Sequence, residues 1–229
     1  MQGMAKTEMK IRSSNPLLWV LAAGVVGWTA SGVFSGMLYW SRSAFVLAYG
    51  VLVAAFLAGY FRAAGVDPIQ QLRRRSVAGI VGGILIGLLL TWNVTSQPGS
   101  DHPQGLGFLG ALAWLGVFYG AIDALLLSVI PVLSIYGTRS REELRQVVPR
   151  VGWGLAALAG SLLVTAMYHV GFAEYRGPAL VHPLVGSSII TTGYLLTGNP
   201  LGAIIAHIIM HATAVVHGME TTVQLPPHY

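Results

Sequence analysis

The run GAIIAHIIMHATAVV, residues 202–216, decides the fold class and raises the main question about this protein. Apart from one threonine and two histidines, it is apolar all round a helix, which is typical of a segment buried in a membrane protein. His207 and His211 lie four residues apart, so they share one face of that helix. Two imidazoles in such a run need polar partners from elsewhere in the chain, because lipid supplies none.

The composition of the whole chain supports the same class. Its 229 residues are 54% hydrophobic and 9% charged, whereas soluble domains carry about 25% charged residues. We therefore predict a single all-α domain, a polytopic transmembrane helix bundle surrounded by membrane lipids. The net charge of +5 comes from short clusters between apolar runs. Because no basic patch is interleaved with aromatic residues, we expect no nucleic-acid partner.

Seven apolar segments predict seven spanning helices. They cover residues 16–38, 44–61, 77–94, 106–136, 151–171, 183–196 and 201–216. The third has glycines at four-residue spacing, which predicts close packing against another helix. The fourth is long, and we expect it to kink or end at Pro131. Residues 1–15 are expected to form a polar cytoplasmic N-terminus without a cleavage site, and residues 218–229 a polar tail.

The distribution of Lys and Arg predicts the orientation in the cell membrane. With the N-terminus in the cytoplasm and seven crossings, eleven of the thirteen basic residues lie inside. Only Arg42 and Arg176 lie outside. Cytoplasmic loops of membrane proteins carry an excess of Lys and Arg, so this orientation is favoured, and the tail is then outside.

Four ionisable residues fall in or at the end of apolar segments. Asp123 is the one acidic residue within such a segment, and His169 ends the fifth. With His207 and His211 they come from three separate helices. A charge at mid-bilayer costs about 2.5–3.5 kcal/mol on insertion scales. We therefore expect the four side chains to meet inside the bundle, where each can hydrogen-bond another.

The chemistry of these four residues leaves several alternatives open. Three imidazoles and a carboxylate suit zinc or another divalent metal, with Asp123, His169, His207 and His211 as ligands. The same groups can activate water without a metal. His169 with His207 or His211 can also ligate a b-type haem. The structural alternatives are an interfacial His169, a histidine pair that only joins helices, and Asp123 paired with a hydroxyl such as that of Ser128.

The second half of the chain, about residues 105–217, resembles the CPBP family of CAAX-protease and bacteriocin-processing membrane proteins. TTGYLLTGNPLGAIIAHIIMHATAVV is similar to its last block, in which His207 matches the family histidine and His211 stands where the family has Asn. LLVTAMYHVGF is similar to the preceding block, and His169 matches its histidine, although Thr165 replaces a phenylalanine. In YGAIDALLLSVI, Asp123 alone stands for the first motif of a Glu pair and an Arg.

The resemblance implies hydrolysis of a membrane-embedded peptide by activated water. The candidate catalytic residues are then Asp123, His169, His207 and His211. The missing Glu pair leaves a second possibility, a non-catalytic membrane subunit or scaffold that keeps the fold and binds partner membrane subunits. The adjacent Glu142 and Glu143 lie in a charged loop, and we interpret them as a solvated charge run. A transporter is less favoured, because seven segments do not divide into two repeats.

Overall fold

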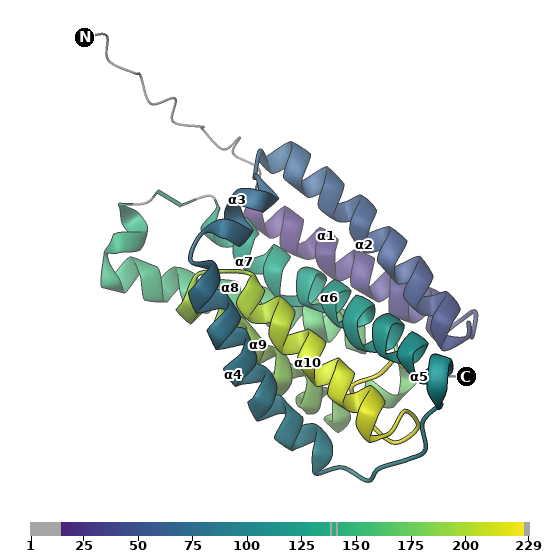
Figure 1. Cartoon of the computed structure of the whole chain (residues 1–229). Helices are drawn as coiled ribbons and strands as arrows, with labels where there is room; N and C mark the ends of the chain where they lie inside the picture. The colour runs from purple at the N-terminus through teal and green to yellow at the C-terminus, as the bar shows by residue number, and fades with distance from the viewer. Residues whose placement is uncertain (1–14, 138, 141, 227–229) are drawn as a thin grey trace.

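The computed structural model describes residues 15–137, 139–140 and 142–226, and every regular element among them is a helix. This confirms the all-α bundle (Figure 1). In chain order the elements are α1 (Pro16–Trp28), η1 (Thr29–Ser35), α2 (Arg42–Ala64), α3 (Pro68–Arg73), α4 (Ser76–Thr95), α5 (Gly105–Ala111), η2 (Leu112–Phe118), α6 (Tyr119–Asp123), η3 (Ala124–Val129), α7 (Ile130–Tyr136), η4 (Glu143–Arg145), α8 (Val147–His169), η5 (Ala173–Tyr175), η6 (Pro178–Leu180), α9 (Val181–Thr197) and α10 (Leu201–His217).

Six helices of the described chain are long and apolar enough to cross a membrane. They are Pro16–Ser35, Arg42–Ala64, Ser76–Thr95, Gly105–Tyr136, Val147–His169 and Pro178–Thr197. α10 is a shorter apolar helix of 17 residues, about 25 Å long at 1.5 Å per residue. The seven predicted segments thus all form helices, and the fifth begins at Val147, earlier than predicted.

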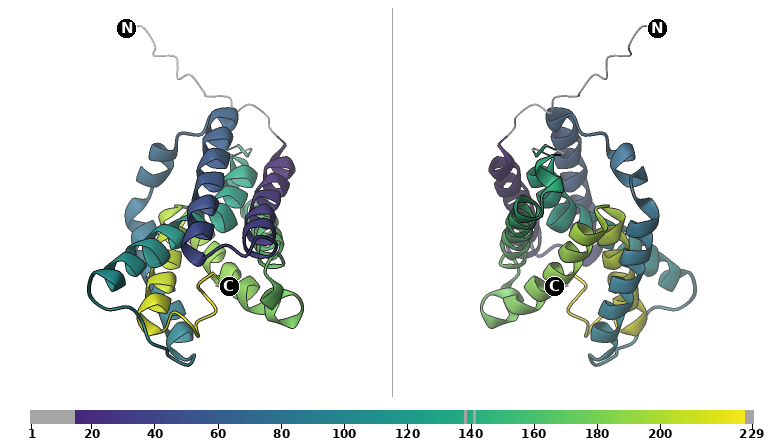
Figure 2. Two further views of the ribbon diagram at one scale, coloured as in Figure 1. Left: turned by 90° about the vertical axis from the view of Figure 1, so that its right-hand side faces the viewer. Right: turned by 90° about the vertical axis from the view of Figure 1, so that its left-hand side faces the viewer.

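α10 lies inside the bundle, along α4 and against the long span that runs from α5 to α7. α1 packs on α7 and α8, and α9 packs on α8 and α4, while α2 lies outside them against α1 and α6. The segment after α10 runs across one end of the bundle (Figure 2). α10, with its two histidines, is therefore surrounded by other helices instead of facing lipid.

The glycines of α4 form its buried face, as their spacing predicts. A Cβ on Gly83 would lie 3.0 Å from the carbonyl oxygen of Leu201, on α10. A side chain there would separate the two helices, so the predicted close packing is confirmed.

The long span from Gly105 to Tyr136 contains two π-helical stretches, η2 and η3, on either side of α6. A π-helical turn holds more residues than an α-helical turn, and it often marks a functional site. Of the two predicted outcomes at Pro131, an end of the helix is wrong. The helix continues to Tyr136, and the irregular turn that a proline needs is supplied by η3 directly before it.

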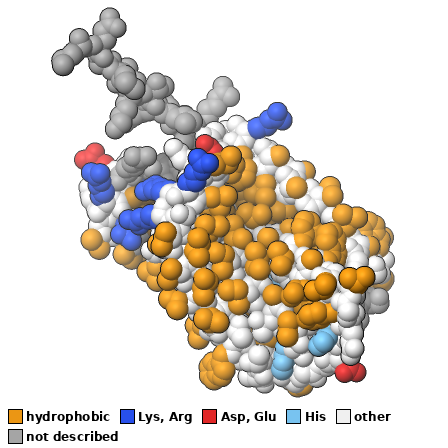
Figure 3. Space-filling model, in the orientation of Figure 1, with side chains coloured by type: hydrophobic (Ala, Val, Ile, Leu, Met, Phe, Trp, Pro, Cys, Tyr) orange, Lys and Arg blue, Asp and Glu red, His pale blue; other side chains and the backbone are white. Residues whose placement is uncertain are grey.

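Hydrophobic side chains cover the middle of the face seen in Figure 3, and Lys and Arg side chains gather toward one end. We call this end the basic end. The connections from α2 through α3 to α4 and from α7 to α8 lie there (Figure 1), and with the adjoining helix ends they carry the described residues Arg62, Arg73, Arg74, Arg75, Arg139, Arg145 and Arg150. Residues 1–14 of the predicted cytoplasmic segment 1–15, and Arg141, lie outside the described residues. An apolar belt with charges at one end is the surface of a membrane protein.

Candidate functional site

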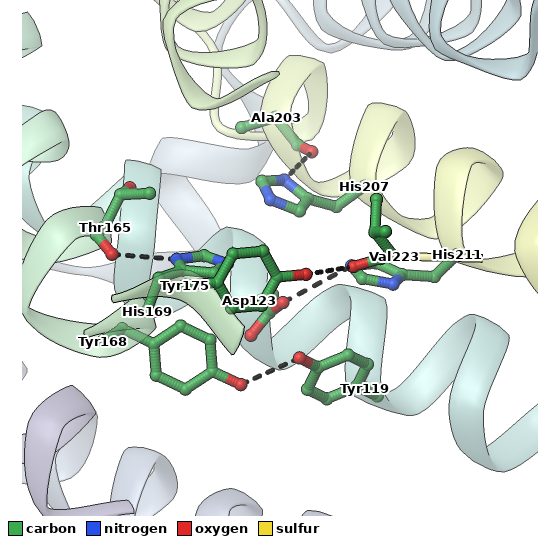
Figure 4. Close-up of polar contacts among 10 residues, drawn as sticks. All are labelled: Tyr119, Asp123, Thr165, Tyr168, His169, Tyr175, Ala203, His207, His211 and Val223. Carbon is green, nitrogen blue, oxygen red and sulfur yellow. Dashed lines mark hydrogen bonds and ion pairs between the residues drawn. The ribbon is translucent and has the colours of Figure 1, made fainter. Parts of the chain in front are cut away.

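Asp123 is the last residue of α6 and lies between the two π-helical stretches. α6 approaches α10 closely at Gly120, where a Cβ would lie 3.0 Å from Ile208 Cα and 3.1 Å from the His211 ring. The absence of a side chain at Gly120 therefore lets the two backbones meet. One turn further along α6, the carboxylate of Asp123 reaches the histidine face of α10 (Figure 4).

Asp123 and His211 form a buried acid–imidazole pair. Asp123 Oδ2 lies 3.4 Å from His211 Nε2, and the two residues are 4% and 2% exposed. Neither Asp123 Oδ1 nor either nitrogen of His211 completes a hydrogen bond within the described residues. The alternative that Asp123 pairs with Ser128 is wrong, because the Ser128 hydroxyl bonds to Thr191 instead, at 2.9 Å. The pair thus has unused hydrogen-bonding capacity in a dry place.

The rings of His169 and His207 are held in the same way. His169 Nδ1 lies 2.8 Å from the carbonyl oxygen of Thr165, and His207 Nδ1 lies 3.3 Å from that of Ala203. A carbonyl oxygen only accepts, so each Nδ1 carries the proton and donates it. Each Nε2 therefore keeps a free lone pair, the form that takes up a proton or binds a metal.

The four predicted residues do come together. The His207 and His211 rings lie parallel within 16°, with centroids 5.9 Å apart. His169 interacts electrostatically with Asp123 and His211, and so does His207. One carboxylate and three imidazoles from α6, α8 and α10 thus share one interior space, which we call the acid–imidazole site.

Four tyrosines surround this site, and none of them is among the site residues predicted from the sequence. They are Tyr49, Tyr119, Tyr168 and Tyr175. The hydroxyls of Tyr119 and Tyr168 share a hydrogen bond of 2.8 Å, and the Tyr119 ring meets the His211 ring edge-on at 4.8 Å. Tyr49 had a usable signal, since it lies well inside the apolar segment of α2, whereas membrane tyrosines usually lie at the interface.

Residues 218–226, which we call the strap, cover the end of the bundle opposite the basic end. Tyr175 links the strap to the site: its hydroxyl donates to the carbonyl of Val223 at 2.5 Å, and its ring meets the His169 ring edge-on at 5.0 Å. Burial raises the pKa of the Tyr175 phenol, and the charges of Glu174 and Asp123 raise it further, so it stays a donor. The described part of the predicted polar tail, residues 218–226, is thus folded onto the bundle, with Leu225 buried.

A second polar cluster lies beside the site, between η3, α8 and α9. This hydroxyl network consists of Ser128, Ser161, Thr165, Ser187 and Thr191. Ser161 donates to the carbonyl of Leu127 at 2.6 Å and bonds the Thr191 hydroxyl at 2.7 Å. Leu127 lies in η3, where π-helical geometry disturbs the regular backbone bonding, so Ser161 satisfies an acceptor that the helix leaves available.

The other described histidines and the Glu142–Glu143 pair lie away from this site. His217 bonds the backbone carbonyl of Gln97 at 2.7 Å, and His182 and His102 are exposed. Glu142 is exposed, and Glu143 accepts a bond from Trp153 Nε1 at 2.7 Å at the basic end. The predicted solvated charge run is confirmed for Glu142, whereas Glu143 is half-buried and makes a structural contact with Trp153.

The donor set matches zinc chemistry, but the distances do not match a bound ion. Among the described residues, no three His, Asp or Glu side chains lie close enough together to hold one metal. As the rings stand, Asp123 and His211 approach each other and the other two imidazoles stay further off. The four side chains, as they are placed, do not form a metal site. No family model matches the chain, and no curated protein or solved structure matches it significantly.

Proposed function

We propose that the protein is an intramembrane hydrolase in which Asp123 and His211 activate a water molecule. The observation that carries this proposal is the 3.4 Å approach of Asp123 Oδ2 to His211 Nε2 in a buried place, with the remaining polar atoms of both groups unpaired. Buried polar groups in proteins are nearly always hydrogen-bonded, and exceptions deserve a functional explanation.

The arrangement supports a different role in the reaction for each of the four residues. With the proton of His211 on Nε2, the ring points it at Asp123, and the carboxylate stabilises the imidazolium that forms when Nδ1 takes a proton from water. His169 and His207, each with a free Nε2 lone pair, accept hydrogen bonds that orient the water and the substrate. The CPBP resemblance implies a membrane-embedded peptide as the substrate.

Reconstituted protein tests the proposal. Wild-type protein in liposomes should cleave a membrane-tethered peptide, and His211→Asn, which keeps a polar side chain but cannot take up a proton, should lower kcat by about 10²-fold or more. His217→Asn is the matched control, because His217 bonds only the Gln97 carbonyl. Absence of cleavage by folded wild-type protein would contradict the proposal and favour a non-catalytic subunit, detectable as a stable partner on co-purification.

Zinc is the alternative cofactor for the same residues, favoured by the free Nε2 lone pairs of His169 and His207. Metal analysis of purified protein, with and without His207→Ala, distinguishes the two forms. For the metal-free mechanism we expect zinc well below one ion per chain in both samples. Stoichiometric zinc in the wild type that His207→Ala removes would instead show that the protein binds zinc at this site. The same sample tests b-type haem by its visible absorption.

We also infer that the basic end faces the cytoplasm, which puts the strap outside the cell membrane. The chain has no cysteine, so single cysteines are clean reporters of this orientation. A membrane-impermeant thiol reagent should label Glu220→Cys in intact cells and should leave Arg145→Cys unlabelled. The reverse pattern would invert the orientation.

A further inference from the structure

Tyr49 is a buried phenol in the first half of α2, on the side of α2 that faces the acid–imidazole site. Its side chain is fully enclosed, at 0% exposure. The ring stacks on Tyr168, with centroids 5.1 Å apart and planes 16° apart, and lies 6.1 Å from the Tyr119 ring. Packing on both rings fixes the direction of its hydroxyl.

The Tyr49 hydroxyl interacts electrostatically with the Asp123 carboxylate, and no hydrogen bond of regular geometry joins it to a described residue. Asp123 Oδ1 and the nitrogens of His211 are unpaired in the same interior space. A phenol, a carboxylate oxygen and an imidazole without hydrogen-bond partners therefore belong to one buried cluster around Asp123. That is the set of groups a hydrolytic site needs around a polar guest.

The hydroxyls of the other three tyrosines all take part in hydrogen bonds. Tyr119 and Tyr168 share one at 2.8 Å, in which one phenol donates and the other accepts while keeping its own proton, and Tyr175 donates to the Val223 carbonyl. Tyr49 is the one of the four whose hydroxyl enters no hydrogen bond within the described residues.

We propose that Tyr49 is the oxyanion donor of the hydrolytic reaction, an inference that rests on the proposed function. The water oxygen bonds to the carbonyl carbon, its proton passes to His211, and the carbonyl electron pair moves onto oxygen. Tyr49 Oη–H donates a hydrogen bond to that oxyanion and keeps its own proton. When the electron pair returns, the C–N bond breaks and His211 gives the proton to the leaving amine.

A pair of Tyr→Phe variants on the same helix tests this role. Tyr49→Phe removes the hydroxyl that interacts with Asp123. Tyr60→Phe, the control, removes one that is also buried, at 2% exposure, where the ring packs edge-on against Trp19 at 5.2 Å. We expect Tyr49→Phe to lower kcat by about 10²–10³-fold with KM unchanged and no fall in Tm, and Tyr60→Phe to keep the wild-type kcat.

A second measurement separates the oxyanion role from packing. A phosphinate peptide, which mimics the tetrahedral intermediate, should bind Tyr49→Phe about 10²-fold more weakly than wild type, while the substrate binds both equally. If the wild type is active and Tyr49→Phe is equally active, the oxyanion role of Tyr49 is overturned and the proposed hydrolase function stands. A loss of kcat that comes with a lower Tm would also overturn it, and an inactive wild type would overturn the proposed function together with it.

Discussion

The hydroxyl network and the acid–imidazole site lie side by side in the same apolar bundle, yet they differ in how well their polar atoms are satisfied. All five residues of the network have a hydroxyl partner, and Ser161 also bonds a backbone carbonyl. In the site, Asp123 Oδ1, both nitrogens of His211 and the Tyr49 hydroxyl complete no hydrogen bond within the described residues. In the same apolar interior, the polar atoms of the network are thus paired, whereas those of the site are largely unpaired.

The difference separates a structural cluster from a functional one. Hydroxyls between membrane helices join them at about 0.6–2 kcal/mol per bond, and a complete network has nothing left for a ligand. An unpaired buried group costs about 1–3 kcal/mol. A site that keeps several such groups is less stable than it would be with apolar residues, which favours a role in binding or reaction over a role in folding.

Asp123→Asn should produce the largest change. The amide keeps the size of the side chain but removes the charge that orients His211, so we expect kcat to fall by about 10²–10⁴-fold. Because the variant removes a poorly paired buried charge, Tm should stay level or rise. Asp67→Asn, which keeps an N-cap acceptor on α3 at the basic end, should change neither. A Tm that falls with the rate would give Asp123 a structural role.

Ser161→Ala should show the opposite behaviour. It leaves the Leu127 carbonyl without its partner, so we expect a loss of about 1–3 kcal/mol of unfolding free energy with little change in kcat. Ser188→Ala is the matched control on α9, because the Ser188 hydroxyl bonds only within its own helix, to Leu184. If Ser161→Ala abolished hydrolysis at full stability, the two clusters would form one functional unit.

Tyr175→Phe should have the smallest effect, and it tests the boundary between the site and the strap. The variant keeps the contact with the His169 ring and removes the bond to Val223. A bond of about 1 kcal/mol corresponds to about fivefold faster amide exchange in residues 218–226. Tyr136→Phe, which removes a similar bond to the Arg150 carbonyl at the basic end, should leave that exchange unchanged.

The helices were predictable because apolar length and flanking polar residues fix a membrane span. The third segment was expected at 77–94 and is Ser76–Thr95. The π-helical stretches were not predictable, since the apolar run that contains them shows no pattern that separates a π-helical turn from an α-helical one. The folding of the strap onto the bundle was missed for a similar reason, because its short polar sequence carries no periodic pattern.

The meeting of Asp123 with the histidines was predictable from energetic cost alone, because lipid tolerates none of them singly. Of the tyrosine shell only Tyr49 had a signal, its place deep in an apolar segment, because an aromatic residue in an apolar run is ordinarily part of the core. The places of Tyr119 and Tyr168 emerge only from contacts across helices, such as the stacking of Tyr168 on Tyr49. Which individual polar atoms have a hydrogen-bond partner was also not predictable from the sequence. The distinction between the two clusters depends on these partners.

Cleavage of a membrane-tethered peptide in ¹⁸O-labelled water tests most directly whether Asp123 and its imidazoles activate water. We predict that the wild-type product carries one ¹⁸O in its new carboxylate and that Asp123→Asn, folded to the same Tm, yields no labelled product above background. Intact peptide after incubation with folded wild-type protein, or equal labelling by the variant, would contradict the account.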